Sequence, residues 1–184
     1  MLLLIITLVV VSSAFAQSPT PASSPPPPAC MTSEFRQFDF WLGKWKVTNP
    51  KSGKQVGTSE ISRVSDGCVI REQWKSAAGT NGMSINYYDA ADHQWHQDWV
   101  GGDGTILHLH GELKGAEMVL TGLTKLAKAT LLNRITWTPF SDGEVKQDMG
   151  YFLRRWPNMA NQLRRNLRQA AVTNLGWVLR HWRK

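Results

Sequence analysis

The sequence predicts an all-β protein whose strands follow one another as an antiparallel meander and close into a barrel or a sandwich. Turn-forming residues recur about every 10 to 20 residues between positions 34 and 147. The stretches between these turns either alternate between apolar and polar residues or are rich in Val, Ile, Thr, Trp and Tyr. Helical periodicity is weak in this part of the chain, so short strands joined by tight turns are the simplest interpretation.

The first 16 residues predict a secretory signal peptide. Residues 2–16 are an apolar run that ends in Ala14-Phe15-Ala16. The run is short for a bilayer-spanning helix and ends in the small residues of a cleavage site. We therefore expect an exported protein, periplasmic or secreted, with a retained membrane anchor as the alternative.

Residues 17–31 predict a disordered linker that is rich in Pro and Ser. This segment holds six of the nine prolines of the chain, which favours a stiff polyproline II tether without core-forming residues. Cys30 at its end and Cys68 are the only cysteines. An oxidising compartment favours a disulfide between them, and two free thiols are the alternative.

The basic charge of the chain is confined to its last part. The whole sequence has a net charge of +7, yet no acidic residue follows Asp148, and eight basic residues do. Residues 1–148 therefore carry a net charge of −1. A folded nucleic-acid-binding domain would carry basic residues over its surface, so we expect no nucleic-acid partner.

Period-two alternation gives three of the expected strands one apolar or aromatic face with isolated polar groups. Such faces can close around a core or a small cavity. The residues on these faces are Ile70, Glu72 and Trp74, then Trp95, Gln97 and Trp99, and then Leu107, Leu109, Gly111 and Leu113.

The most specific motif covers residues 38–45, Phe-Asp-Phe-Trp-Leu-Gly-Lys-Trp. It resembles the signature Phe-Asp-Phe-Trp-Leu-Gly-Glu-Trp of a bacterial family of exported proteins of unknown function, with Lys44 in place of the usual Glu. Further matches to this family occur at residues 67–74, 86–89, 95–99 and 134–139.

This resemblance implies a calycin-like, lipocalin-like antiparallel barrel over residues 32–147. Gly43-Lys44-Trp45 also looks like the Gly-x-Trp motif that opens the first strand of lipocalins, in which the Trp plugs the closed end of the barrel.

The resemblance ends after Gln147, and residues 148–184 form a basic tail that departs from the family pattern. If the codons of the tail are read one nucleotide out of frame, the codons of Met149-Gly150 must encode Trp, and positions 156 and 159 must encode Gly and Trp. These residues have the spacing of the next strand in the family. We therefore hypothesise a frameshifted remnant from about Asp148 onward. Taken as it stands, the tail has apolar residues every three or four positions from Asn158 to Trp182 and predicts a basic amphipathic helix.

The aromatic residues of the body predict a partly open cavity for a small hydrophobic or aromatic ligand, with core filling as the alternative. Glu72, Gln97 and Asn86 are candidate orienting groups. The expected ligand-binding residues are Trp45, Glu72, Trp74, Tyr87, Trp95, Gln97, Trp99 and Trp137.

Two alternative functions remain open. The sequence has no Ser/His/Asp spacing, phosphate loop, paired-carboxylate motif or zinc-type cysteine pattern, so we expect no catalytic residue, metal ligand or cofactor. An enzyme or a haem-type cofactor barrel that uses His96 or Glu72 is one alternative. The other is a structural envelope protein whose basic tail contacts a membrane surface.

Overall fold

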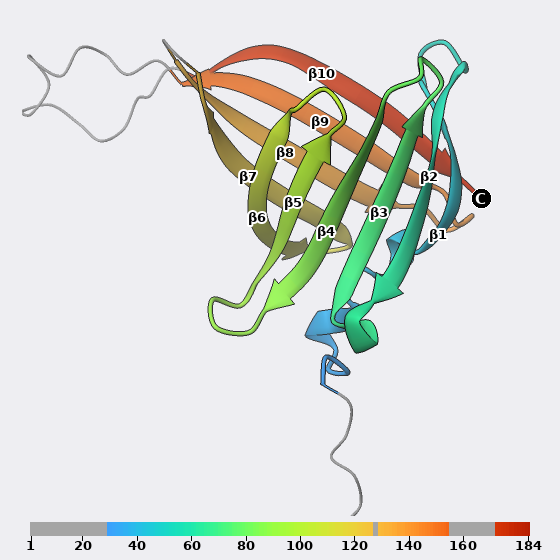
Figure 1. The fold of residues 1–184 in the computed structure, drawn as a ribbon, viewed down its shortest axis with the longest axis vertical. Coiled ribbons are helices and arrows are strands. Elements are labelled where there is room, and N and C mark those ends of the chain that lie inside the picture. The colour runs from blue at the N-terminus through green and yellow to red at the C-terminus, as the bar shows by residue number, and fades with distance from the viewer. Residues whose placement is uncertain (1–28, 127–128, 155–171) are drawn as a thin grey trace, which may run out of the picture.

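The protein is described by a computed structural model that covers residues 29–126, 129–154 and 172–184. In these residues ten strands and three short 3₁₀ helices form one antiparallel barrel (Figure 1). The helices are η1 (Glu34–Arg36), η2 (Asp39–Trp41) and η3 (Ser65–Gly67). The strands are β1 (Gly43–Thr48), β2 (Gln55–Val64), β3 (Val69–Ser76), β4 (Asn81–Asp89), β5 (Gln94–Gly101), β6 (Ile106–Lys114), β7 (Glu117–Lys125), β8 (Thr130–Pro139), β9 (Val145–Arg154) and β10 (Val172–Arg183).

Each strand pairs with its neighbours in the chain, and the ring is closed by the pairing of β1 with β10. In that pairing Lys46 lies opposite Arg183, and Thr48 lies opposite His181. Closure leaves none of the ten described strands as a sheet edge with exposed backbone N–H and C=O groups. The predicted all-β meander that closes as a barrel is confirmed.

The predicted inward faces are also confirmed. Ile70, Glu72 and Trp74 of β3 are buried, and the residues between them are more exposed. β5 buries Trp95 and Gln97, and β6 buries Leu107 and Leu109. Because successive side chains of a strand point to opposite faces, the inner face of the wall forms the core and the outer face is solvated.

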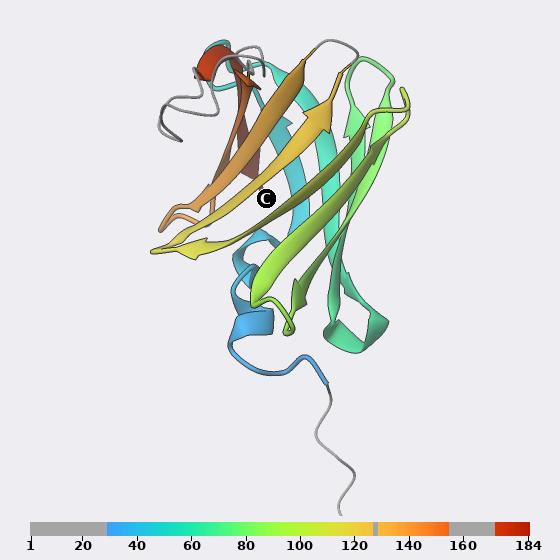
Figure 2. The same ribbon diagram turned by 90° about the vertical axis from the view of Figure 1, so that its left-hand side faces the viewer.

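The N-terminal segment closes the lower end of the barrel, as Figures 1 and 2 show from two sides. Phe38 and Trp41 of this segment are fully buried, with ring centroids 5.0 Å apart. Trp137 and Trp182 contact Trp41 edge-on or tilted, at 5.3 and 5.4 Å. Trp45 donates its indole N–H to the carbonyl of Trp41 at 2.8 Å, which joins the first strand to this aromatic plug.

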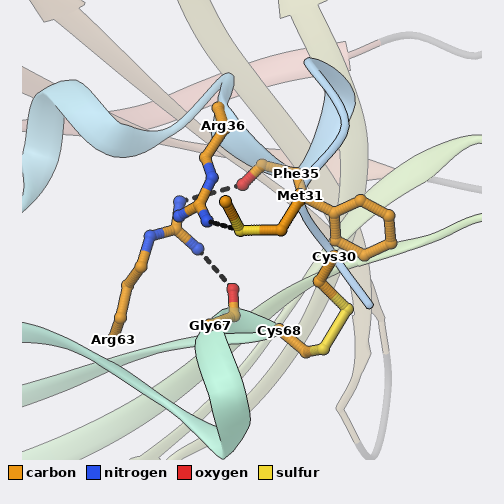
Figure 3. The surroundings of a disulfide bond; sticks show 7 residues. All are labelled: Cys30, Met31, Phe35, Arg36, Arg63, Gly67 and Cys68. Carbon is orange, nitrogen blue, oxygen red and sulfur yellow. Dashed lines mark hydrogen bonds between the residues drawn. A yellow bond between two sulfur atoms is a disulfide. The ribbon is translucent and has the colours of Figure 1, made fainter. Parts of the chain in front are cut away.

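A disulfide and an arginine hold this segment against the barrel. Cys30 is bonded to Cys68, so the predicted disulfide is present (Figure 3). Arg63 of β2 donates hydrogen bonds to the carbonyl of Gly67 at 2.6 Å and to that of Phe35 at 2.9 Å.

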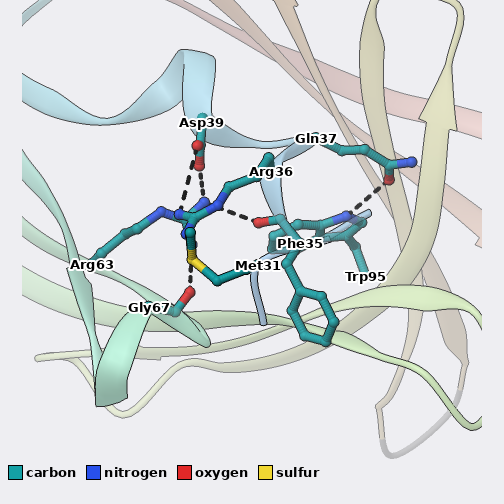
Figure 4. A network of polar contacts seen from close by, with 8 residues as sticks. All are labelled: Met31, Phe35, Arg36, Gln37, Asp39, Arg63, Gly67 and Trp95. Carbon is teal, nitrogen blue, oxygen red and sulfur yellow. Dashed lines mark hydrogen bonds and ion pairs between the residues drawn. The ribbon is translucent and has the colours of Figure 1, made fainter. Parts of the chain in front are cut away.

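The same arginine takes part in a larger polar network under the barrel (Figure 4). Arg63 pairs with Asp39, which also lies 3.8 Å from Arg36. Gln37 accepts a hydrogen bond from the indole N–H of Trp95 at 3.1 Å. The plug is therefore tied to β2, β5 and the turn between β2 and β3 by covalent and polar contacts as well as by packing.

The expected helix of the tail is wrong for residues 172–183, which form β10. The barrel also extends beyond the expected boundary at residue 147, because β9 continues to Arg154. Without β9 and β10, the edges of β8 and β1 would be open. Strands at these two edges hydrogen-bond to backbone groups of β8 and β1 that would stay unpaired if the tail were a surface helix. The remainder of the predicted helix, the signal segment and most of the linker lie outside the described residues.

Candidate functional site

A cavity of about 280 Å³ opens at the upper end of the barrel, away from the plug. Its rim is formed by the loops that join β3 to β4 and β5 to β6. The rim residues are Thr80, Asn81, Gly101, Asp103 and Thr105. The plug seals the lower end, so a ligand would enter the barrel between these rim residues.

Two tryptophans lie flat against the inner wall of the cavity because glycines on neighbouring strands make room for them. A Cβ added to Gly57 of β2 would come within 2.4 Å of the Trp74 ring, and one added to Gly82 of β4 would come within 2.3 Å of the Trp99 ring. Side chains at these glycines would push the indoles toward the barrel axis. The wall is completed by Leu107, Ile135 and Met149, so a band of aromatic and apolar side chains lies between a polar rim and a polar floor.

Glu72 is the central polar group of the cavity floor. Its side chain is 3% exposed, and its two oxygens accept hydrogen bonds from Ser59 Oγ at 3.1 Å and from Ser84 Oγ at 3.0 Å. Burial raises the pKa of Glu72 from 4.5 to about 7, although both hydroxyls and the charge of Arg180 act in the opposite direction. The carboxyl is therefore close to half-protonated at neutral pH.

A chain of hydrogen bonds leads from the cavity wall to this carboxyl. Gln97 Nε2 donates to Asn86 Oδ1 at 2.8 Å, and Asn86 Nδ2 donates to Ser84 Oγ at 3.0 Å. Asn86 Nδ2 also donates to the carbonyl of Ile70 at 3.1 Å. Because Ser84 in turn donates to Glu72, the network holds the Gln97 amide at the cavity surface in a fixed orientation.

Arg180 of β10 brings a positive charge to the same floor. Its guanidinium carbon lies 4.6 Å from the centre of the Trp74 ring. Burial lowers the pKa of Arg180, and the nearby Glu72 and Tyr151 oppose this effect. Arginine remains protonated in proteins, so the floor holds a cation at neutral pH.

Gln147 and Tyr151, both on β9, lie beside this cation. Gln147 is the direct register partner of Arg180, and its side chain is 7% exposed. Burial raises the pKa of the Tyr151 phenol, which is opposed by Arg180. Tyr151 is therefore neutral at physiological pH, and its hydroxyl donates to Met149 Sδ at 2.9 Å. Arg180 and Gln147 supply donors that can bind the polar end of a small molecule.

Four of the eight expected ligand-binding residues meet at the cavity, namely Glu72, Trp74, Gln97 and Trp99. Trp45, Trp95 and Trp137 are also inside the barrel, but they pack in the aromatic layer around Phe38 and Trp41. Depth along the barrel separates the two groups, and alternation carries no information about depth.

Tyr87 is on the outer face, so its expected place in the cavity wall is wrong. Its ring stacks on His96 with centroids 5.3 Å apart, and the preceding Asn86 points inward. The cavity residues that the sequence did not reveal include Gln147, Met149, Tyr151 and Arg180. Apart from Gln147, these residues come from the segment that was interpreted as a tail, and their strand character depends on long-range pairing.

The histidines of β5 and β6 are on the outer face as well. His96 Nε2 lies 2.9 Å from Asp92 Oδ2, and its ring stacks 6.1 Å from that of His110. His96 therefore does not point into the barrel, where a haem-type group would need it. Asp89, Asp92 and His96 place potential ligand atoms within 4.8 Å of one another, and they are the one such group among the described residues.

Catalysis in the cavity would have to use Glu72, because its pKa near 7 suits proton transfer. The two serine hydroxyls that are bonded to Glu72 do not line the cavity, so they do not form a nucleophile that a substrate there could reach. The geometry is compatible with a ligand-binding cavity whose floor holds a carboxyl with a raised pKa.

A comparison with protein-family models and one with curated proteins each found no match to this chain. The functional conclusion therefore depends on the cavity itself.

Proposed function

We propose that the protein is an exported, lipocalin-like barrel that binds a small apolar or aromatic molecule in its upper cavity. The observation that carries this proposal is a space of about 280 Å³, walled by Trp74 and Trp99 and floored by hydrogen-bonding groups. This volume is at the small end of the range for ligand pockets, which favours a ligand of roughly a dozen non-hydrogen atoms.

The polar floor argues against simple core filling. A barrel of this kind can be filled completely by its own side chains, as the lower half of this one is. Here Gln97, Gln147 and Arg180 instead face open space. Buried polar groups are costly unless they are hydrogen-bonded, and a ligand would supply partners for the Arg180 guanidinium and the Gln147 amide.

Export is supported by two features. The apolar segment that ends at Ala16 has the form of a signal peptide. The disulfide between Cys30 and Cys68 fits a non-reducing compartment. No helix in the described part of the chain is long and apolar enough to cross a bilayer.

Isothermal titration with 2-naphthamide, a neutral two-ring probe, tests the proposal. We expect binding with a Kd on the order of 100 µM. Leu107→Trp fills the cavity and should abolish binding, since Leu107 lines the wall and is 8% exposed. The matched control is Leu123→Trp, because Leu123 is 52% exposed on the outside of β7.

The proposal fails if neither this probe nor its carboxylate analogue 2-naphthoate binds, or if Leu107→Trp and Leu123→Trp bind the probe equally well. Near-ultraviolet circular dichroism establishes that both variants keep the native packing of their tryptophans.

A further inference from the structure

We propose that the ligand is a small monocarboxylic acid whose carboxylate is bound by Arg180 and whose aromatic or branched apolar body lies against Trp99. This inference rests on the proposed function, because it names the chemical class of the molecule in the same cavity. It is carried by the charge and the unused donors of the cavity floor.

Arg180 has hydrogen-bonding capacity that the described residues do not use. The guanidinium has five N–H donors and stacks on Trp74, and none of these donors hydrogen-bonds to a described residue. No described carboxylate lies within ion-pair distance of it. A carboxylate matches the guanidinium fork with two parallel hydrogen bonds, which is the strongest common way to satisfy such a group.

The residues beside Arg180 extend the same preference. Gln147 lines the cavity and carries an amide N–H₂, so it can donate to an anion held by Arg180. The Tyr151 hydroxyl donates to Met149 Sδ at 2.9 Å, and because a thioether is a weak acceptor, a bound carboxylate would be the better partner for it. The opposite wall offers Leu107 and Trp99 to an apolar body. An acid that enters through the mouth with its carboxylate leading would place each end against surface of matching character.

Glu72 determines when this site favours an anion. The charged or titratable groups that line the cavity with Glu72 are Arg180 of β10, Tyr151 of β9 and Asp103 at the exposed rim. β2, β4 and β5 face Glu72 with the neutral Ser59, Ser84 and Gln97.

Protonation of Glu72 changes the net charge of the floor. With Glu72 neutral, the floor carries one uncompensated positive charge, and with Glu72 ionised it carries none. A bound carboxylate therefore favours the protonated form of Glu72, so binding takes up protons near pH 7 and weakens as the pH rises above it.

The test compares 2-naphthoate with 2-naphthamide, which have the same rings and nearly the same shape but differ in charge. At pH 6 we expect the acid to bind at least about tenfold more tightly than the amide. Arg180→Met should remove this advantage and change the affinity for the amide by less than about threefold. The matched control is Arg183→Met, since Arg183 is on the same strand but forms an exposed ion pair with Glu144.

A measurement on the unmodified protein keeps the inference testable if Arg180→Met does not fold. Titrations in two buffers with different ionisation enthalpies count the protons that are taken up on binding. We expect roughly half a proton per 2-naphthoate at pH 7 and none per 2-naphthamide.

Two outcomes would overturn the inference. Equal affinities for acid and amide, without proton uptake, would show that the floor does not select an anion. Equal losses for both probes in Arg180→Met would show that Arg180 only shapes the cavity. If 2-naphthamide binds and Leu107→Trp blocks it, the proposed function stands even when the preference for acids fails. If neither probe binds, both fail.

Discussion

The two ends of the barrel are built from the same alternating strands but differ in what fills them. At the lower end Phe38, Trp41, Trp137 and Trp182 are all fully buried and contact one another. At the upper end, Trp74 and Trp99 lie back against the wall over glycines, and Glu72 and Arg180 face the space between them.

The difference comes from the N-terminal segment. This segment enters the lower end and supplies the rings that fill it, whereas no described residue fills the upper end. Substitutions at the lower end should therefore cost mainly stability, and substitutions at the upper end should mainly change binding and its dependence on pH.

The largest effect is expected from Trp41→Ala. Removing a fully buried indole should lower the free energy of unfolding by about 3–5 kcal/mol, because the plug cannot collapse into the space left behind. Trp99→Ala, at the cavity wall, should cost less than half as much but weaken 2-naphthamide binding about tenfold. Urea denaturation and calorimetric titration measure the two effects. A Trp99→Ala variant that loses more stability than Trp41→Ala would contradict the division.

Loss of the disulfide should come next. The bond between Cys30 and Cys68 spans 38 residues and should contribute roughly 3–4 kcal/mol by restricting the unfolded chain. Replacing both cysteines with serine should lower the urea midpoint, and reduction of the native protein should do the same. Binding by the folded fraction should be unchanged, and a loss of affinity would mean that the staple also shapes the cavity.

Glu72→Gln tests the floor through the pH dependence of stability. The folded pKa of about 7 lies above the ordinary 4.5, so the folded state holds this proton more tightly than the unfolded chain does. The resulting stabilisation is complete below pH 4.5 and is lost as the pH rises through 7, a change of roughly 3 kcal/mol.

We expect Glu72→Gln to match the native protein near pH 4.5 and to exceed its stability by up to roughly 3 kcal/mol near pH 8, where the native carboxyl is ionised. Thermal or urea unfolding across this range measures the effect. Parallel stability profiles for the two proteins would be inconsistent with a buried, proton-binding Glu72.

The smallest effect is expected from Gly82→Ala. A Cβ there would overlap the Trp99 ring and move the indole toward the cavity, which should weaken 2-naphthamide binding about fivefold. Gly57→Ala should also move Trp74, but its Cβ would come within 2.4 Å of the Lys75 carbonyl oxygen, so a loss of stability should accompany the weaker binding. An unchanged affinity in both variants would mean that the indoles do not limit the cavity.

The inner face of the wall could be predicted from the sequence because strand alternation is a local property. Spacing alone places Glu72, Trp74, Gln97 and Trp99 on the inward faces of their strands. The inward placement of Tyr87 is wrong because successive residues of a strand point to opposite faces. Asn86 points into the barrel, so Tyr87 points outward. The sequence also does not predict that Trp95 packs against the plug while Trp99 lines the cavity, because this difference depends on how far the plug reaches into the barrel.

Arg180 could not be predicted because its place depends on pairing between distant segments. The apolar spacing that predicted a helix in the tail is compatible with a strand once β9 and β1 supply backbone partners on both sides. β10 puts Arg180 beside Gln147 inside the barrel and Trp182 in the plug. The hypothesis of a shifted reading frame stays a prediction, which the nucleotide sequence around codons 146–149 tests.

The most direct test of the central claim, that the upper cavity is a binding site and the lower end is not, is a crystal structure with 6-bromo-2-naphthoate. Anomalous scattering from bromine locates the rings, and the electron density orients the carboxylate. We expect the bromine near the mouth, the rings against Trp99 and Leu107, and the carboxylate at Arg180. Bromine found only on the outer face of the barrel, or a carboxylate at the rim beside Asp103, would contradict it.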